Sequence, residues 1–340
     1  MILVILCCLL FIAMTVYPFW PGYKELKKGE DNENLYIKRD YIRDPRYFGL
    51  SFRKLLTPFL PEARRLPVGV TLAIDLSKKE ALTVGPVAAV QAIVEERMTL
   101  FPQAAVLPPQ SQFAKEIYAL SDLAIGSDST VRAVAGNADC RLATGTEIIR
   151  WLDVEGNLLV AADCNLGLSA SSRQKIVLGG KNCLFKRLFA PIIEIGTANA
   201  LKTDFTFAGM QQYPAYSDVV YDIKKIKEAA VFNKNIVTHK KMVVRQDTVV
   251  LGNIKAYKEL LLEENVKIIG NIFCEGDLII QNSCRITGTV FVQGNLKVSN
   301  NVSFGEKGKI KSVIVRKDVT LGSGVVLHGF VLTEGVGKTV

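Results

Sequence analysis

The segment IGNIFCEGDLII at residues 269–280 returns eighteen residues later as TGTVFVQGNLKV at residues 287–298. In both copies apolar residues alternate along short runs, and a glycine with a polar neighbour separates one run from the next. Alternating side chains point to opposite faces of a β-strand. The pair therefore predicts short strands joined by tight turns, repeated with a period of eighteen residues.

The same rhythm extends beyond this pair in both directions. Residues 230–307 divide into thirteen hexads, in which the first and third positions are apolar except for Thr248 and Thr238. An amphipathic helix would instead place apolar residues at i, i+3 and i+4. Since three hexads make eighteen residues, we expect an all-β fold, a three-sided parallel β-helix with one coil per eighteen residues.

Glycines mark the expected corners of these coils. The spacing of eighteen residues separates Gly252, Gly270 and Gly288, and it also separates Gly276 and Gly294. Because glycine tolerates a positive φ angle in a tight corner, we predict that these five residues form β-helix corners.

A degenerate copy of the repeat precedes the regular one. Leu123, Cys140, Leu158 and Ile176 follow one another at intervals of 17 or 18 residues. We therefore predict a degenerate β-helix block at 119–197, a connecting insertion at 198–229 and a regular block at 230–340. Whether the two blocks stack coaxially is left open. Residues 21–118 are predicted to form a linker and accessory region, with a strand near Gly69–Asp75 and a helix within Lys79–Phe101.

The amino-terminal residues are unusually apolar. The chain has a mean hydropathy of +0.22 although 22% of its residues are charged, and residues 1–20 hold no ionisable side chain. A 20-residue helix spans the ~30 Å hydrocarbon core of a bilayer. Lysines and arginines follow this segment but do not precede it. The positive-inside rule then predicts a single transmembrane helix at 1–20 and a cytoplasmic body, at a bacterial inner membrane.

The two quoted copies, with their glycine, aliphatic residue and glycine–Asp/Asn pattern, resemble the bactofilins, which are bacterial polymer-forming cytoskeletal proteins. The resemblance covers residues 230–307. It implies right-handed coils, polymerisation without a nucleotide or other cofactor, contact with membrane lipid, and a scaffolding role for cell-envelope or morphogenesis proteins.

The ends of a β-helix expose unpaired backbone groups, which can pair with another strand. Repeat proteins usually need polar terminal caps to remain monomeric. The sequence shows no such cap near its carboxyl end. We therefore predict that Val313, Val325 and Val331 mediate end-to-end self-association.

The alternative is an enzyme, an acyltransferase on a left-handed β-helix, because that architecture also has eighteen-residue coils and often uses a histidine base. His239 and His328 are the only histidines, and both occupy turn positions of the hexads. No Cys-x-x-Cys pair or carboxylate cluster suggests a metal or catalytic site. The basic residues near 224–245 lack the interleaved aromatic residues typical of nucleic-acid binding. We therefore expect a non-catalytic protein without a nucleic-acid partner, and assign the net charge of +9 to membrane-facing surfaces.

Overall fold

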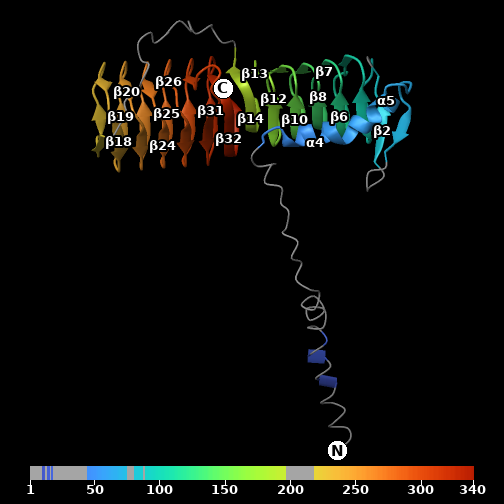
Figure 1. Ribbon diagram of the computed structural model, residues 1–340, viewed down its shortest axis with the longest axis horizontal. Coiled ribbons are helices and arrows are strands. Elements are labelled where there is room, and N and C mark those ends of the chain that lie inside the picture. The colour runs from blue at the N-terminus through green and yellow to red at the C-terminus, as the bar shows by residue number, and fades with distance from the viewer. Residues whose placement is uncertain are drawn as a thin grey trace, which may run out of the picture. The chain divides into compact units, whose positions relative to one another are not determined.

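The computed structural model describes residues 10–11, 14–15, 17, 44–74, 80–86, 89–196 and 218–340. Residues 44–340 form one compact unit, and residues 1–43 belong to another. The larger unit is an elongated β-solenoid built from two blocks (Figure 1).

The second block winds through three parallel faces, because each strand pairs with the strand three positions later in the chain. One pairing series runs β15–β18–β21–β24–β27–β30, and the other two run β16–β19–β22–β25–β28–β31 and β17–β20–β23–β26–β29. All three series end on β32, which supplies the whole last coil. The first series comprises β15 (Val219–Tyr221), β18 (Asn235–Thr238), β21 (Ile254–Ala256), β24 (Ile272–Cys274), β27 (Val290–Val292) and β30 (Lys311–Val315). The second comprises β16 (Lys225–Ile226), β19 (Met242–Val244), β22 (Leu260–Leu262), β25 (Leu278–Ile280), β28 (Leu296–Val298) and β31 (Val319–Leu321). The third comprises β17 (Val231–Phe232), β20 (Val249–Leu251), β23 (Lys267–Ile269), β26 (Arg285–Ile286) and β29 (Ser303–Phe304), and the last strand is β32 (Val326–Thr339).

The hexad pattern is confirmed by the burial of its inward positions. From Ile236 to Phe304 every first and third hexad residue is buried in one continuous core. The two threonine exceptions are satisfied inside it, because Thr238 donates to the Ile223 carbonyl (3.2 Å) and Thr248 donates to the Lys227 carbonyl (2.9 Å). An all-β solenoid with eighteen-residue coils is therefore correct for this block, and the hand of its coils stays a prediction.

The first block is also a three-sided solenoid, but its strands are longer and bend around corners. A long face pairs β2, β4, β6, β8, β10, β12 and β14 in parallel, and β1 adds to β2 in an antiparallel direction. A second face pairs β5, β7, β9, β11, β13 and β14, and β3 pairs with the start of β6 on the third. The strands are β1 (Thr71–Ala73), β2 (Ala81–Val84), β3 (Val94–Glu95), β4 (Met98–Phe101), β5 (Ala105–Val106), β6 (Gln112–Ala119), β7 (Leu123–Ile125), β8 (Thr130–Gly136), β9 (Cys140–Leu142), β10 (Glu147–Val154), β11 (Leu158–Val160), β12 (Ser169–Ser172), β13 (Lys175–Leu178) and β14 (Leu184–Ile195).

The two blocks meet at their carboxyl ends. The last coil of the first block, β14, pairs antiparallel with β32 around the perimeter of the solenoid, for example Leu184 with Lys338, Leu188 with Val331 and Glu194 with Val326. Figure 1 accordingly places the carboxyl terminus in the middle of the solenoid. Two coils of the same hand that advance toward each other turn in opposite senses, so antiparallel pairing indicates that both blocks share one hand. The blocks stack coaxially.

Two short helices cover part of the long face. The helix α4 (Tyr47–Leu56) continues through η2 (Thr57–Phe59) into α5 (Leu60–Ala63), and α4 crosses the strands along the solenoid axis (Figure 1). Phe52, Leu56 and Ala63 form a second hydrophobic cluster with outward side chains of the sheet, among them Leu100 and Tyr118. The layer lies outside the solenoid core.

Several expectations for the amino-terminal third are wrong. Among the described residues no helix is long and apolar enough to cross a membrane, which overturns the predicted transmembrane helix at 1–20; most of that range lies outside the described residues. The composition of Lys79–Phe101 predicted a helix, but this range contains β2, β3 and β4. The strand expected near Gly69–Asp75 is present as β1.

The boundaries of the second block also differ from expectation. It begins at β15, eleven residues before the predicted start at residue 230, because its first coil has lost the regular hexad spacing. The predicted irregularity near residues 307–312 is real, since Val290 pairs with Val313 after twenty-three residues in place of eighteen.

Candidate functional site

The predicted corner glycines lie where successive coils approach most closely. A Cβ atom on Gly270 or Gly288 would stand 2.2 Å from the carbonyl oxygen of the glycine one coil before it. Gly252, Gly276 and Gly294 likewise leave no room, with backbone atoms at 2.5–2.6 Å. The reason for glycine is therefore close backbone contact. The left-handed corner conformations that we had assigned to glycine belong to other residues, such as Asn265 (φ 56°) and Ser283 (φ 61°).

The three valines predicted to mediate self-association lie inside the junction of the two blocks. Val313, Val325 and Val331 are 3%, 0% and 0% exposed, and Val331 faces Leu188 of β14. The junction is closed by backbone hydrogen bonds on both sides, including Gly324 N–H to the Ile195 carbonyl at 2.7 Å. The expectation that the carboxyl end lacks a cap is wrong, because the first block of the same chain caps it.

The amino end of the second block is open in the described part of the chain. Its first-coil strands β15, β16 and β17 each pair on one side only. The inward-facing Val220, Ile223 and Phe232 are only partly buried, whereas the corresponding residues of the next coil are fully buried. Val231 on the outside is 71% exposed. This coil therefore presents both an unpaired sheet edge and unsealed core.

Positive charge surrounds this open end. Lys241 pairs with Glu259 of the next coil (2.8 Å) and Lys234 with Asp218 (3.4 Å). The lysines of the first two coils outnumber the carboxylates around them; they are Lys224, Lys225, Lys227, Lys234, Lys240 and Lys241, against Asp218, Asp222 and Glu228. Any two such ends repel each other at low ionic strength.

The amino end of the first block is sealed by side chains. Phe101 and Phe113 meet edge to face at 6.3 Å between ring centroids and are 1% and 2% exposed. The strand β1 adds a further antiparallel strand beside β2. Of the two amino ends, only that of the second block exposes its core in the described residues.

A buried charge cluster fastens α4 to the first block. Asp153, on the outward side of β10 and 2% exposed, accepts hydrogen bonds from Arg46 Nε (2.7 Å), from Arg53 Nη1 and from Ser171 Oγ (2.6 Å). Arg46 also pairs with Glu155 at 2.6 Å. Burial opposes ionisation of Glu155, but the hydrogen bond with Arg46 and the nearby arginine charges outweigh it and lower its pKa. The only sequence signal for this cluster is an acidic residue within the otherwise apolar end of β10.

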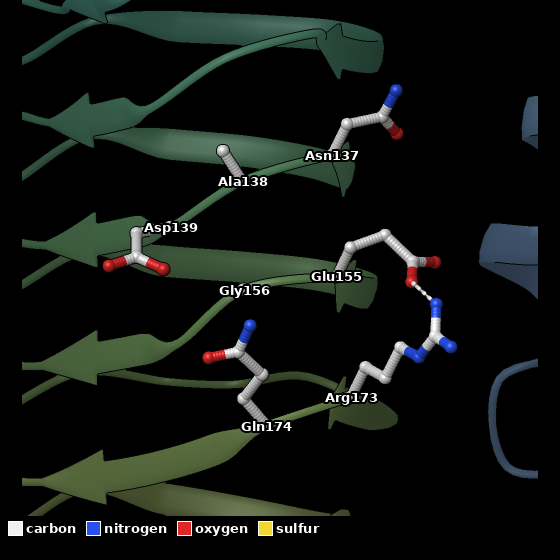
Figure 2. A pocket seen from close by; sticks show the side chains of 7 residues that line it. All are labelled: Asn137, Ala138, Asp139, Glu155, Gly156, Arg173 and Gln174. Carbon is white, nitrogen blue, oxygen red and sulfur yellow. Dashed lines mark hydrogen bonds and ion pairs between the residues drawn. The ribbon is translucent and has the colours of Figure 1, made fainter.

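A shallow polar hollow lies beside this cluster, on the turns that follow β8 and β10. Figure 2 shows Glu155 and Arg173 facing each other across it, with Asn137, Asp139 and Gln174 around them. The carboxylates are already engaged, because Glu155 pairs with Arg46 and Arg173 while Asp139 accepts from the backbone N–H of Asn157 at 2.7 Å. The hollow therefore offers hydrogen-bonding groups but no free acid and base pair.

The histidines lie apart from each other and from the hollow. His328 is at the junction, where Nδ1 lies 3.3 Å from the Pro191 carbonyl, and burial lowers its pKa. His239 is exposed, contacts Asp222 at 3.2 Å and stacks on Tyr257.

The cysteines outside the amino-terminal segment are buried inside the solenoid. Burial raises the pKa of Cys140 to about 12 and that of Cys274 to about 11, so both remain thiols at neutral pH. Within the described residues no three histidines, cysteines or carboxylates converge as a metal site.

Comparison with known proteins adds no name to this geometry: no family model, curated protein or solved structure matches the chain.

Proposed function

We propose that this protein is a non-catalytic, bactofilin-like scaffold that self-associates through the open amino end of its second block. The observation that carries the proposal is the first coil of that block, β15–β17, which combines one-sided strand pairing with a partly exposed core. Exposed strand edges are templates for pairing with another chain.

The junction between the blocks supplies a geometric precedent. There, two coil ends of the same hand pair antiparallel, and their valine and leucine side chains become fully buried. Two copies of the chain that meet at their open ends would also wind in opposite senses, so their β15, β16 and β17 strands would pair antiparallel. The contact would be isologous, with the same surface on both partners.

The proposal is tested by sedimentation velocity of the full chain across protein concentration and without nucleotide. We expect a reversible monomer–dimer equilibrium above the 37.4 kDa of one chain. The variant Val220→Lys places a charge at the open coil end, facing inward, and should shift the equilibrium at least tenfold toward monomer.

The matched control is Val94→Lys, which changes an exposed residue (73%) at the other end of the solenoid and should leave the association unchanged. Association that persists in Val220→Lys would come from another part of the chain. A monomer at all concentrations, or equal effects of the two lysine variants, would remove the proposed end-to-end contact.

A further inference from the structure

The long face of the first block continues without interruption into the second block. Through the β14–β32 pairing, the series β10–β12–β14 joins the series β32–β30–β27–β24 in one sheet. Phe189 of β14 therefore lies opposite Phe330 of β32, and Arg187 lies opposite Leu332. The outward side chains of both blocks form one surface.

The helices α4 and α5 cover this surface only over the first block. There Phe52 packs edge to face on Tyr118 and Trp151, at 6.1 and 5.7 Å between ring centroids. Arg46 and Arg53 then fasten the helix to the outward carboxylate of Asp153. The contact thus combines an apolar helix face with ion pairs between the helix and the sheet.

Beyond α4 the outward positions of the sheet remain apolar and partly exposed. They form a stripe that crosses five strands: Phe189, Phe330, Leu332, Ile314, Phe291 and Phe273. Phe273 and Phe291 stack at 5.2 Å between ring centroids, so this part of the stripe is flat.

An arginine without a partner stands in this stripe. The Nε atom of Arg187 is buried and has no hydrogen-bond partner in the described residues, and its guanidinium lies 6.0 Å from the centre of the Phe330 ring. Buried polar groups normally have a partner, and a carboxylate matches a guanidinium best. At the other end of the stripe Lys255 lies over Phe273 and Tyr257, 5.5 and 4.7 Å from the ring centres.

We propose that this stripe binds an acidic amphipathic α-helix of a partner protein, which lies along the solenoid axis in line with α4. The charges are the reverse of those under α4, because here the sheet supplies the cation and the partner supplies the carboxylate. Five strand spacings of ~4.8 Å separate Arg187 from Lys255, so the helix would extend ~24 Å, or about 16 residues. The inference is independent of end-to-end self-association.

The probe is a synthetic peptide with the sequence of residues 44–66, in which Arg46→Glu and Arg53→Glu replace the two arginines. Its apolar side chains are those that already pack on this sheet, and its carboxylates would be repelled by Asp153 under α4. A second peptide keeps both arginines. Binding to the full chain is measured by fluorescence anisotropy.

We expect the acidic peptide to bind the wild-type chain at least tenfold more tightly than the basic one. The variant Arg187→Glu should reverse this preference. The variant Arg141→Glu makes the same charge change on an exposed residue of β9, on another face, and should alter neither affinity.

Equal binding of the two peptides, an equal effect of Arg141→Glu, or no binding of the acidic peptide would overturn the proposal. Self-association that is lost in Arg187→Glu, without peptide binding, would also overturn it and assign the stripe to a second copy of this chain. Circular dichroism of each variant shows whether the solenoid remains folded.

Discussion

Replacing Asp153 with asparagine should release α4 from the solenoid while the solenoid itself stays folded. The substitution keeps the size of the side chain and removes its charge. Two arginines, only 11% and 12% exposed, then lose their shared carboxylate. Breaking a buried ion pair from one side costs about 3–5 kcal/mol.

The lower end of that range applies here, because both arginines keep other partners. Arg46 retains Glu155 at 2.6 Å, and Arg53 retains the carbonyl oxygens of Gly136 (2.7 Å) and of residue 153 itself (2.9 Å). A loss of about 3 kcal/mol corresponds to a roughly 100-fold larger opening constant for the helix.

Native-state hydrogen exchange measures this opening segment by segment. Amides of α4 should exchange roughly 100-fold faster in Asp153→Asn, whereas amides of β24 in the second block should keep their rates. Ser171→Ala removes one hydrogen bond to the same carboxylate and serves as a graded control, with an expected cost of about 1 kcal/mol. Less than threefold acceleration in α4, or equal acceleration in β24, would refute the reasoning.

Other parts of the structure make further predictions. Gly288→Ala forces a Cβ against the Gly270 carbonyl and should cost about 3 kcal/mol in urea unfolding, whereas Gly308→Ala, with open space around it, should cost about 1 kcal/mol through its positive φ alone. Val331→Lys buries a charge in the junction and should cost about 4 kcal/mol or more of unfolding free energy, contrary to our first expectation that it leaves the fold intact. Because the pKa of Glu155 is lowered from 4.5, its contribution to α4 docking should be full above pH 4.5 and lost as the pH falls below that value; Glu155→Gln should flatten this acid dependence of α4 exchange. Self-association should strengthen between 50 and 500 mM salt in sedimentation runs, because salt screens the lysines of the open end.

The regular part of the solenoid could be predicted from sequence because its contacts repeat at a fixed spacing. Each inward residue from Ile236 to Phe304 packs against residues about eighteen positions away, so one period describes the whole block. The same reasoning located the insertion before Val313, since only the phase of the pattern changes there.

The junction and the helix layer could not be predicted in this way because each is made of a single pairing between distant segments. Nothing in the period of either block indicates that β14 meets β32, 131 residues beyond its end. Likewise the contact of Arg46 with Asp153 joins residues 107 positions apart. Composition misled the analysis at Lys79–Phe101, where tertiary pairing with β1 and β6 outweighs local helix propensity.

The position of β32 at the very end of the chain has a consequence for biosynthesis. When the ribosome has made β14, the strand that covers it does not yet exist, and another 130 residues must be translated before Val326 appears. At ~5–20 residues per second this takes roughly 7–26 s. For that interval each nascent chain carries an uncovered β14 edge, and neighbouring chains on one messenger RNA carry identical ones. Codon usage or a chaperone that shortens this exposure would therefore decide how much of the protein reaches its native pairing.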